Sequence, residues 1–71
     1  MRLYFTLDNP KQFDKCEKIL RKSTYFSDDF NENEGYFGFE TEDQDDTDSL
    51  ELYLAELFLS NDIDGSFEGL E

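Results

Sequence analysis

Hydrophobic and polar side chains alternate along the first residues of the chain. Leu3, Phe5 and Leu7 occupy every second position, and a residue with a polar group separates each from the next. A period of two is typical of a strand that buries one face. It predicts a β-strand over residues 2–7.

A helix start follows this strand, and the periodicity changes. Asn9 is a good N-cap, Pro10 suits the first helical position, and Gln12 stands at the Glu/Gln position of a capping box. The pattern predicts a helix from Pro10 to about Lys22. Its apolar stripe consists of Phe13, Cys16, Ile19 and Leu20. We interpret Cys16, the single cysteine, as a buried structural thiol.

Two aromatic-rich runs, 25–30 and 36–42, flank a short polar segment at 31–35 that ends in glycine. This pattern predicts a β-hairpin. Phe26, Asp28 and Phe30 share one side of the first run, and Phe37, Phe39 and Thr41 share one side of the second. Asp28 and Asp29 are adjacent, so in a regular strand they point to opposite faces. One of them therefore lies over the edge of the core or marks a bulge.

An acidic linker is predicted at 42–48, followed by a helix at 48–59 with Asp48 as its N-cap. The apolar spacing predicts a core-facing stripe of Leu50, Tyr53, Leu54, Leu57 and Phe58. Leu52, Ala55 and Leu59 lie outside that stripe, so the helix is apolar nearly all round. It is either a central helix covered by the rest of the fold or a helix with a second apolar face for a partner or another copy.

Residues 63–70 have a weak strand pattern, which completes the order β-α-β-β-α-β. That order is typical of the ferredoxin-like arrangement, an α+β fold. We expect a four-stranded antiparallel sheet with both helices on one face, formed by a single domain over residues 1–71. Eight Phe and four Tyr supply much of the apolar volume that so short a chain needs.

Charge is distributed very unevenly along the chain. All six Lys and Arg precede residue 23, whereas sixteen of the nineteen acids follow it, and the net charge is −13. Surfaces of soluble proteins ordinarily mix the two signs. A long one-signed stretch disfavours direct binding to nucleic acid, whose phosphates are met by Lys and Arg, and to anionic membranes.

The residues of common catalytic sites are missing from the sequence. There is no His, and the four glycines match neither a P-loop nor a dinucleotide-binding motif. We therefore expect a protein that is not an enzyme and has no cofactor. No apolar run approaches the ~20 residues of a membrane span, and a single cysteine fits a reducing compartment. The expected location is the cytoplasm, that of the host if the protein is phage-encoded.

The segment from Ser60 to Glu71 resembles an EF-hand calcium loop over twelve residues. Asp62 and Asp64 fall at ligand positions, Gly65 at the turn and Glu71 at the last ligand position. However, Ser60 replaces the first acidic ligand, and no second hand is present to pair with this one. We interpret the segment as an acidic turn that leads into the last strand, and we assign no metal site.

In size, acidity and lack of catalytic residues the chain resembles the small acidic DNA-mimic inhibitors of phages and mobile elements, such as anti-restriction and anti-CRISPR proteins. The resemblance implies a protein that blocks the basic nucleic-acid-binding surface of a host nuclease or CRISPR effector with carboxylates spaced like phosphates. The implied contact residues lie in the hairpin, the linker and the helix start: Asp28, Asp29, Glu32, Glu34, Tyr36, Glu40, Glu42, Asp43, Asp45, Asp46, Asp48, Glu51 and Tyr53.

Two other functions remain open at this point. One is a small structural or assembly protein that dimerises through the apolar helix 50–59. The other is an immunity protein that neutralises a basic nuclease toxin, which would use the same acidic surface.

Overall fold

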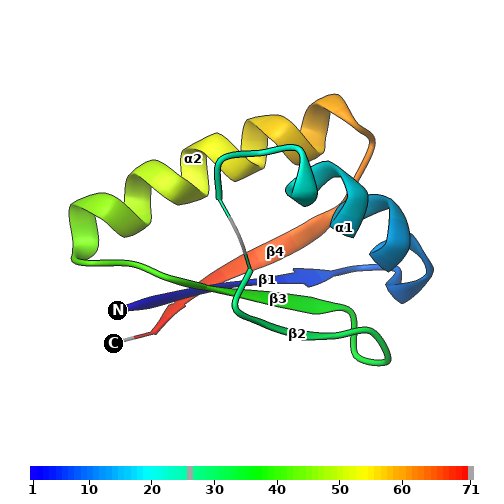
Figure 1. Ribbon diagram of the computed structural model, residues 1–71, viewed down its shortest axis with the longest axis horizontal. Coiled ribbons are helices and arrows are strands. Elements are labelled where there is room, and N and C mark those ends of the chain that lie inside the picture. Colours follow the sequence, from blue (N-terminus) through cyan, green and yellow to red (C-terminus); the bar gives the residue numbers. More distant parts are fainter. Residues whose placement is uncertain (26, 71) are drawn as a thin grey trace.

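A computed structural model describes residues 1–25 and 27–70 of the chain (Figure 1). Its helices and strands follow the predicted order, with one additional short 3-10 helix. The elements are β1 (Arg2–Leu7), η1 (Pro10–Gln12), α1 (Phe13–Arg21), β2 (Asp29–Asn31), β3 (Tyr36–Glu40), α2 (Gln44–Ser60) and β4 (Gly65–Leu70). None of the described helices is both long enough and apolar enough to cross a membrane.

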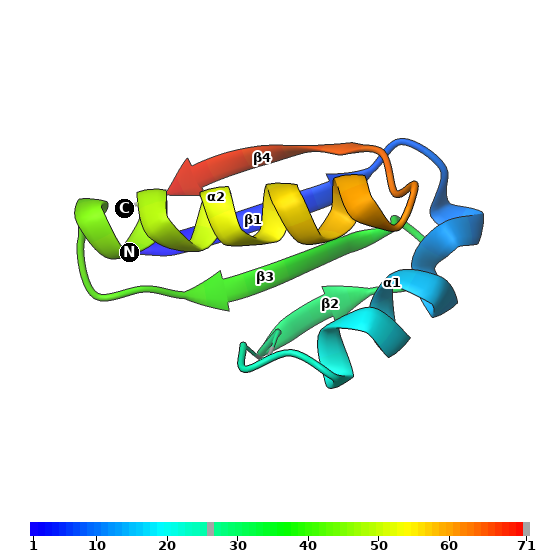
Figure 2. The same cartoon turned by 90° about the horizontal axis from the view of Figure 1, so that it is seen from above.

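The four strands form one antiparallel sheet in the order β2-β3-β1-β4. Both helices cover the same face of this sheet, and the other face is open (Figures 1 and 2). Together with the element order, this strand order is the ferredoxin-like arrangement that the sequence predicts.

The core lies between the sheet and the helices and is rich in phenylalanine. Strands β1 and β3 contribute their inward positions, as the alternation predicts, and α1 and α2 contribute their apolar stripes. The buried apolar residues are Leu3, Phe5, Leu7, Phe13, Cys16, Leu20, Phe37, Phe39, Leu50, Leu54, Phe58 and Ile63. The rings of Phe13 and Phe37 stack at 4.5 Å between centroids, which joins α1 to β3.

The first helical segment begins as predicted, but Gln12 does not complete a capping box. The Asn9 side chain accepts a hydrogen bond from the Lys11 N–H, and Pro10 begins η1. The Gln12 amide instead donates to the Asp62 carbonyl at 3.1 Å. The side chain that the capping-box pattern assigns to the helix start therefore binds a residue 50 positions away in the sequence.

The second helix begins earlier than predicted, and this changes where the acids lie. Its N-cap is Asp43, whose carboxylate accepts a hydrogen bond from the Asp46 N–H at 2.8 Å, so the prediction of Asp48 as N-cap is wrong. Residues 44–48 belong to the first turns of α2 and do not form a linker. Acids are favourable here because they face the positive end of the helix dipole.

The C-terminal end of α2 is closed by a residue in the left-handed region. Asp62 has φ of 58°. Its N–H donates to the Leu59 carbonyl, and the Ile63 N–H donates to the Phe58 carbonyl. These two bonds form a Schellman motif, and the buried Ile63 supplies its hydrophobic contact. Ile63 thus belongs to the helix cap, and β4 begins two residues later.

The hairpin strands are shorter than predicted, and Phe26, which the parity argument used, lies outside the described residues. Asp29 pairs with Gly38 in the register, and the Asp28 N–H also donates to the Gly38 carbonyl. Two consecutive residues therefore oppose one, which is the arrangement of a β-bulge. The bulge resolves the conflict between the adjacent acids, because neither has to enter the core.

Candidate functional site

The largest group of predicted contact residues lies where β3 passes into α2. We call this surface the acidic end. All of its side chains are exposed. It consists of Glu42, Asp43, Asp45, Asp46, Asp48 and Glu51.

Hydrogen bonds within the acidic end hold several of its carboxylates in place. Asp43 caps the helix, and the Asp46 carboxylate accepts a hydrogen bond from the Glu42 N–H at 2.9 Å. The side chain of Gln44 donates to Asp48 at 2.8 Å. These side chains are thus partly ordered before any partner arrives, which lowers the entropic cost of binding.

A buried pair of threonines attaches the acidic end to the sheet. The Thr41 and Thr47 hydroxyl oxygens lie 2.7 Å apart, and Thr47 also donates to the Asp43 carbonyl. Both residues are buried. The pair connects the segment after β3 to the first turn of α2 and so determines how the acids are presented.

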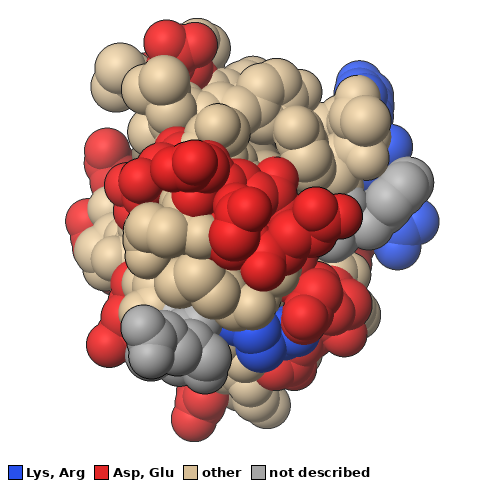
Figure 3. Space-filling model, turned by 90° about the vertical axis from the view of Figure 1, so that its left-hand side faces the viewer, with Lys and Arg blue, Asp and Glu red and all other residues tan. Residues whose placement is uncertain are grey.

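The charge of the acidic end is not compensated by bases. The ion pairs of the described residues are Arg2–Asp28, Arg2–Glu40 and Arg21–Glu17. None of them includes a residue of the acidic end. Figure 3 views the molecule from this side, and acidic atoms spread across the middle of the face while basic atoms occupy small areas.

A second group of acids lies on the open face of the sheet and is organised around Arg2. The Arg2 guanidinium contacts both carboxylate oxygens of Asp28, at 2.6 and 3.2 Å, and Glu40 at 2.8 Å. It also donates to the Tyr4 hydroxyl. The hydrogen bond to Arg2 lowers the pKa of Asp28 below its ordinary value. Asp28 and Glu40 are therefore already partly neutralised within the chain.

Tyr36 and Asp29 continue this open face away from Arg2. The Tyr36 ring meets Tyr4 edge to face at 6.0 Å. The negative charge of Asp29 raises the pKa of Tyr36, because it disfavours a second negative charge nearby. Tyr36 thus presents a protonated hydroxyl at neutral pH.

The remaining predicted contact residues lie elsewhere. Glu32 and Glu34 are in the turn between β2 and β3, at the end of the sheet opposite the acidic end, as the register of β1 with β3 requires. Tyr53 was expected on the core-facing stripe of the helix, but it is 40 % exposed and lies 5.2 Å from Tyr25, ring to ring. The structure therefore does not bring all predicted residues into one surface.

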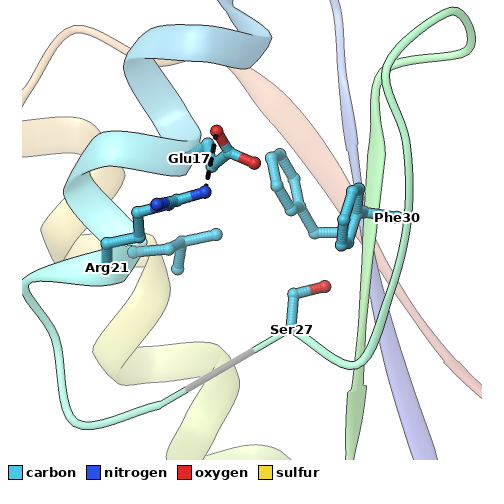
Figure 4. Close-up of a pocket in the computed structure, with 6 residues that line it drawn as sticks. Glu17, Arg21, Ser27 and Phe30 are labelled. Atoms are coloured by element: carbon cyan, nitrogen blue, oxygen red, sulfur yellow. Dashed lines mark ion pairs between the residues drawn. The ribbon is translucent and has the colours of Figure 1, made fainter.

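A cavity of about 340 Å³ lies between α1 and the β2–β3 hairpin (Figure 4). Glu17 on its wall pairs with Arg21 at 3.7 Å, and the Ser27 hydroxyl lies 2.9 Å from two backbone carbonyl oxygens, those of Asp29 and Gly38, between which it shares its one proton. Phe30, which is 55 % exposed, forms another wall. Among the described lining residues no nucleophile is matched with a base, so we assign no chemistry to this cavity.

Two other candidate sites of the sequence have a structural role. Cys16 is fully buried, and burial raises the pKa of its thiol to about 12. The segment that resembles a calcium loop forms the helix cap and then β4, while Glu71 lies outside the described residues. Within residues 1–25 and 27–70, no three His, Cys, Asp or Glu side chains are placed to hold a metal ion.

Sequence reasoning missed the residues that hold these surfaces together. Arg2 falls in the predicted strand 2–7 but was assigned no role, and Thr47 was assigned to the linker 42–48. A signal for Arg2 is present in the sequence, because it is the one base of the six that precedes the predicted helix from Pro10 to about Lys22. Thr47 carries no such signal, because its partner Thr41 was expected on the other side of a loop.

Comparisons of the chain with family models, with curated proteins and with solved structures found no match.

Proposed function

We propose that the protein is a non-enzymatic inhibitor that binds the basic nucleic-acid-binding surface of another protein through the acidic end. The observation that carries this proposal is a dense group of exposed carboxylates, several of them held by hydrogen bonds, that form no ion pair with a base among the described residues. An enzyme of the common hydrolytic classes would need a nucleophile and a base in one cleft, and the described residues offer neither together.

The density of charge supports mimicry of a nucleic acid. Asp45, Asp46, Asp48 and Glu51 lie within seven residues of α2, whose six rises span about 9 Å of helix axis. This gives one charge per ~2–3 Å of axis, near the ~1.7 Å of duplex DNA. With Glu42 and Asp43 beside the helix start, the surface approaches the field that a basic DNA-binding channel recognises.

The uneven distribution of charge also favours fast and oriented association. Five of the six bases lie on η1 and α1 or directly after them, whereas the acidic end lies at the start of α2. A partner with a positive cleft therefore attracts one end of the molecule more strongly than the other. Opposite fields of this kind raise association rates by about 10–10³-fold.

The proposal is tested with two variants of equal charge. In the first, Asp45→Asn, Asp48→Asn and Glu51→Gln neutralise the acidic end and leave the capping residues Asp43 and Asp46 in place. The second is the matched control at the opposite end of the sheet, with the changes Asp8→Asn, Glu32→Gln and Glu34→Gln. Each variant removes three negative charges, so an effect of net charge alone would be equal in both.

The immobilised proteins are incubated with bacterial lysate at about 0.1 M and about 0.5 M salt. Retained proteins are identified by mass spectrometry and then challenged with duplex DNA or RNA. We expect the wild type and the control variant to retain a nucleic-acid-binding protein that competing nucleic acid or salt releases. The variant of the acidic end should lose it. Equal retention by both variants, or no such protein on the wild type, would refute the proposal.

A further inference from the structure

The two edges of the sheet differ in how they resist pairing with another strand. The edge at β2 is three residues long, carries the bulge at Asp28 and Asp29, and is acidic. Bulges, short strands and charges are the usual protection of sheet edges. The edge at β4 is longer, has no bulge among its described residues, and carries a single acid, Glu68. It is six residues long with the sequence GSFEGL, it pairs with β1 on one side, and no described strand pairs with its other side.

The hydrogen-bonding groups that β4 offers at this edge follow from its pairing with β1. The Asp8 N–H donates to the Asp64 carbonyl, which marks residues 8 and 64 as a hydrogen-bonded pair. Hydrogen-bonded and non-bonded pairs alternate along an antiparallel ladder. The backbone groups of Ser66 and Glu68 therefore point to β1, and those of Gly65, Phe67 and Gly69 point to the free edge.

The three outward residues are symmetric about Phe67. If a second β4 pairs antiparallel with a two-fold axis at Phe67, Phe67 faces its own copy and Gly65 faces Gly69. All three outward residues of each strand then form hydrogen bonds. If the second β4 slides by two residues in either direction, at least one outward residue of each strand no longer faces an outward residue of the other.

Charge selects the same register. With the axis at Phe67, Glu68 lies opposite Ser66 of the second copy. Moving the axis to Ser66 places Glu68 opposite Asp64, and moving it to Glu68 places two Glu68 side chains opposite each other. Like charges directly across a strand pair are destabilising, so the self-complementary register also avoids repulsion on the strand.

The helix beside β4 supplies an apolar surface for the same contact. Ala55 and Leu59 line a shallow cavity of about 290 Å³ together with Phe67 and Ile63. Leu59 is 77 % exposed and Leu52 is 65 % exposed, although both are large and apolar. A two-fold axis at Phe67 brings the two copies of α2 side by side, so that this surface faces its counterpart.

The β4 edge and the outer side of α2 lie on the side of the molecule opposite α1 and β2, as the view from above shows (Figure 2). We infer that β4 and the outer face of α2 form a homodimer interface, with an eight-stranded continuous sheet.

The inference is tested by the mass of the protein in solution, measured by sedimentation or light scattering up to about 1 mM. We expect the mass to rise from 8.4 kDa towards twice that value. At about 0.5 M salt the rise should begin at lower concentration, because salt screens two copies of charge −13. A mass that stays at the monomer value throughout would overturn the inference.

Gly69→Pro tests the edge itself. Its N–H points away from β1, and a Cβ there would meet only Thr47 Cγ2 at 3.8 Å, so the substitution removes an outward donor while the ladder to β1 stays intact. We expect this variant to remain monomeric with an unchanged far-UV circular dichroism spectrum, while Gly69→Ala still dimerises. If a folded Gly69→Pro variant dimerised as strongly as the wild type, the contact would lie elsewhere and the inference would be overturned.

Ser66→Lys tests the register and does not depend on the behaviour of the proline variant. It places a base opposite Glu68 of the second copy, so the dimer should form at several-fold lower concentration. Thr24→Lys adds the same charge in an exposed loop away from the edge and serves as the matched control. If both lysines promoted dimerisation equally, the effect would come from net charge alone, and this would contradict the register.

Discussion

Replacing Thr47 by valine tests whether the buried hydroxyl pair holds the acidic end in place. Thr47 donates to the Asp43 carbonyl, so the Thr41 hydroxyl must donate to Thr47. Valine keeps the shape but leaves the Thr41 hydroxyl buried without an acceptor. The Asp43 carbonyl keeps a donor, because the Thr47 N–H also bonds to it at 3.0 Å. The cost of Thr47→Val is therefore about 1–3 kcal/mol, that of one orphaned buried polar group.

The other members of the mutant cycle have different expected costs. In Thr41→Val the Thr47 hydroxyl still reaches Asp43, so only one hydrogen bond of about 0.5–1.5 kcal/mol is lost. The double variant has no orphaned hydroxyl and gains apolar burial. We expect it to be more stable than Thr47→Val alone, although it carries an additional substitution.

Urea unfolding followed by circular dichroism measures the four free energies of unfolding. In a domain of this size each 1 kcal/mol also shifts Tm by about 4–8 °C, so the differences are well resolved. Strictly additive costs in the double variant would refute the pairing of the two hydroxyls.

Three further predictions follow from individual contacts. Asp62→Gly should stabilise the fold by about 1 kcal/mol, because glycine adopts the left-handed conformation without strain and an acid leaves the negative end of α2; thermal unfolding measures this, and Asp62→Asn shows the effect of charge alone. Arg2→Gln should lower the urea midpoint at pH 7. Because Arg2 lowers the pKa of Asp28 in the folded state, the difference from wild type should shrink as pH falls through that pKa; a difference independent of pH contradicts this. Cys16, buried and with a pKa of about 12, should react with Ellman's reagent at pH 8 only after unfolding.

The order of elements was predictable because each long segment has a strong local pattern. The alternation from Leu3 to Leu7 gave the central strand, and the spacing of Leu50, Leu54 and Phe58 gave the buried side of α2, all confirmed by burial. The exposure of Leu52 and Leu59 also agrees with their place outside the predicted stripe. Periodicity is informative here because one face of each element meets one core.

The errors arose where distant residues decide the local conformation. The start of α2 looked like a linker because Asp and Thr are weak helix formers, but Thr41 gives Thr47 a buried partner and Asp43 caps the turn. The position of Asp28 depends on Arg2, which is 26 residues away. Local patterns contain neither contact, so the contact surfaces were predicted less well than the elements that support them.

The two proposed interfaces respond to salt in opposite directions, and this difference can separate them. Binding of the acidic end to a basic partner is an attraction between unlike charges, so it weakens as salt shortens the Debye length from about 10 Å at 0.1 M. Pairing of two β4 edges brings together copies of charge −13, so screening strengthens it.

The acidic end and the β4 edge are also different surfaces, and a dimer would present two acidic ends. We therefore expect Gly69→Pro to weaken partner binding only through the loss of this bivalence, whereas neutralising Asp45, Asp48 and Glu51 should abolish partner binding and promote dimerisation. If the acidic-end variant lost partner binding and dimerisation together, the two functions would share one surface, and the separation argued from the fold would be wrong.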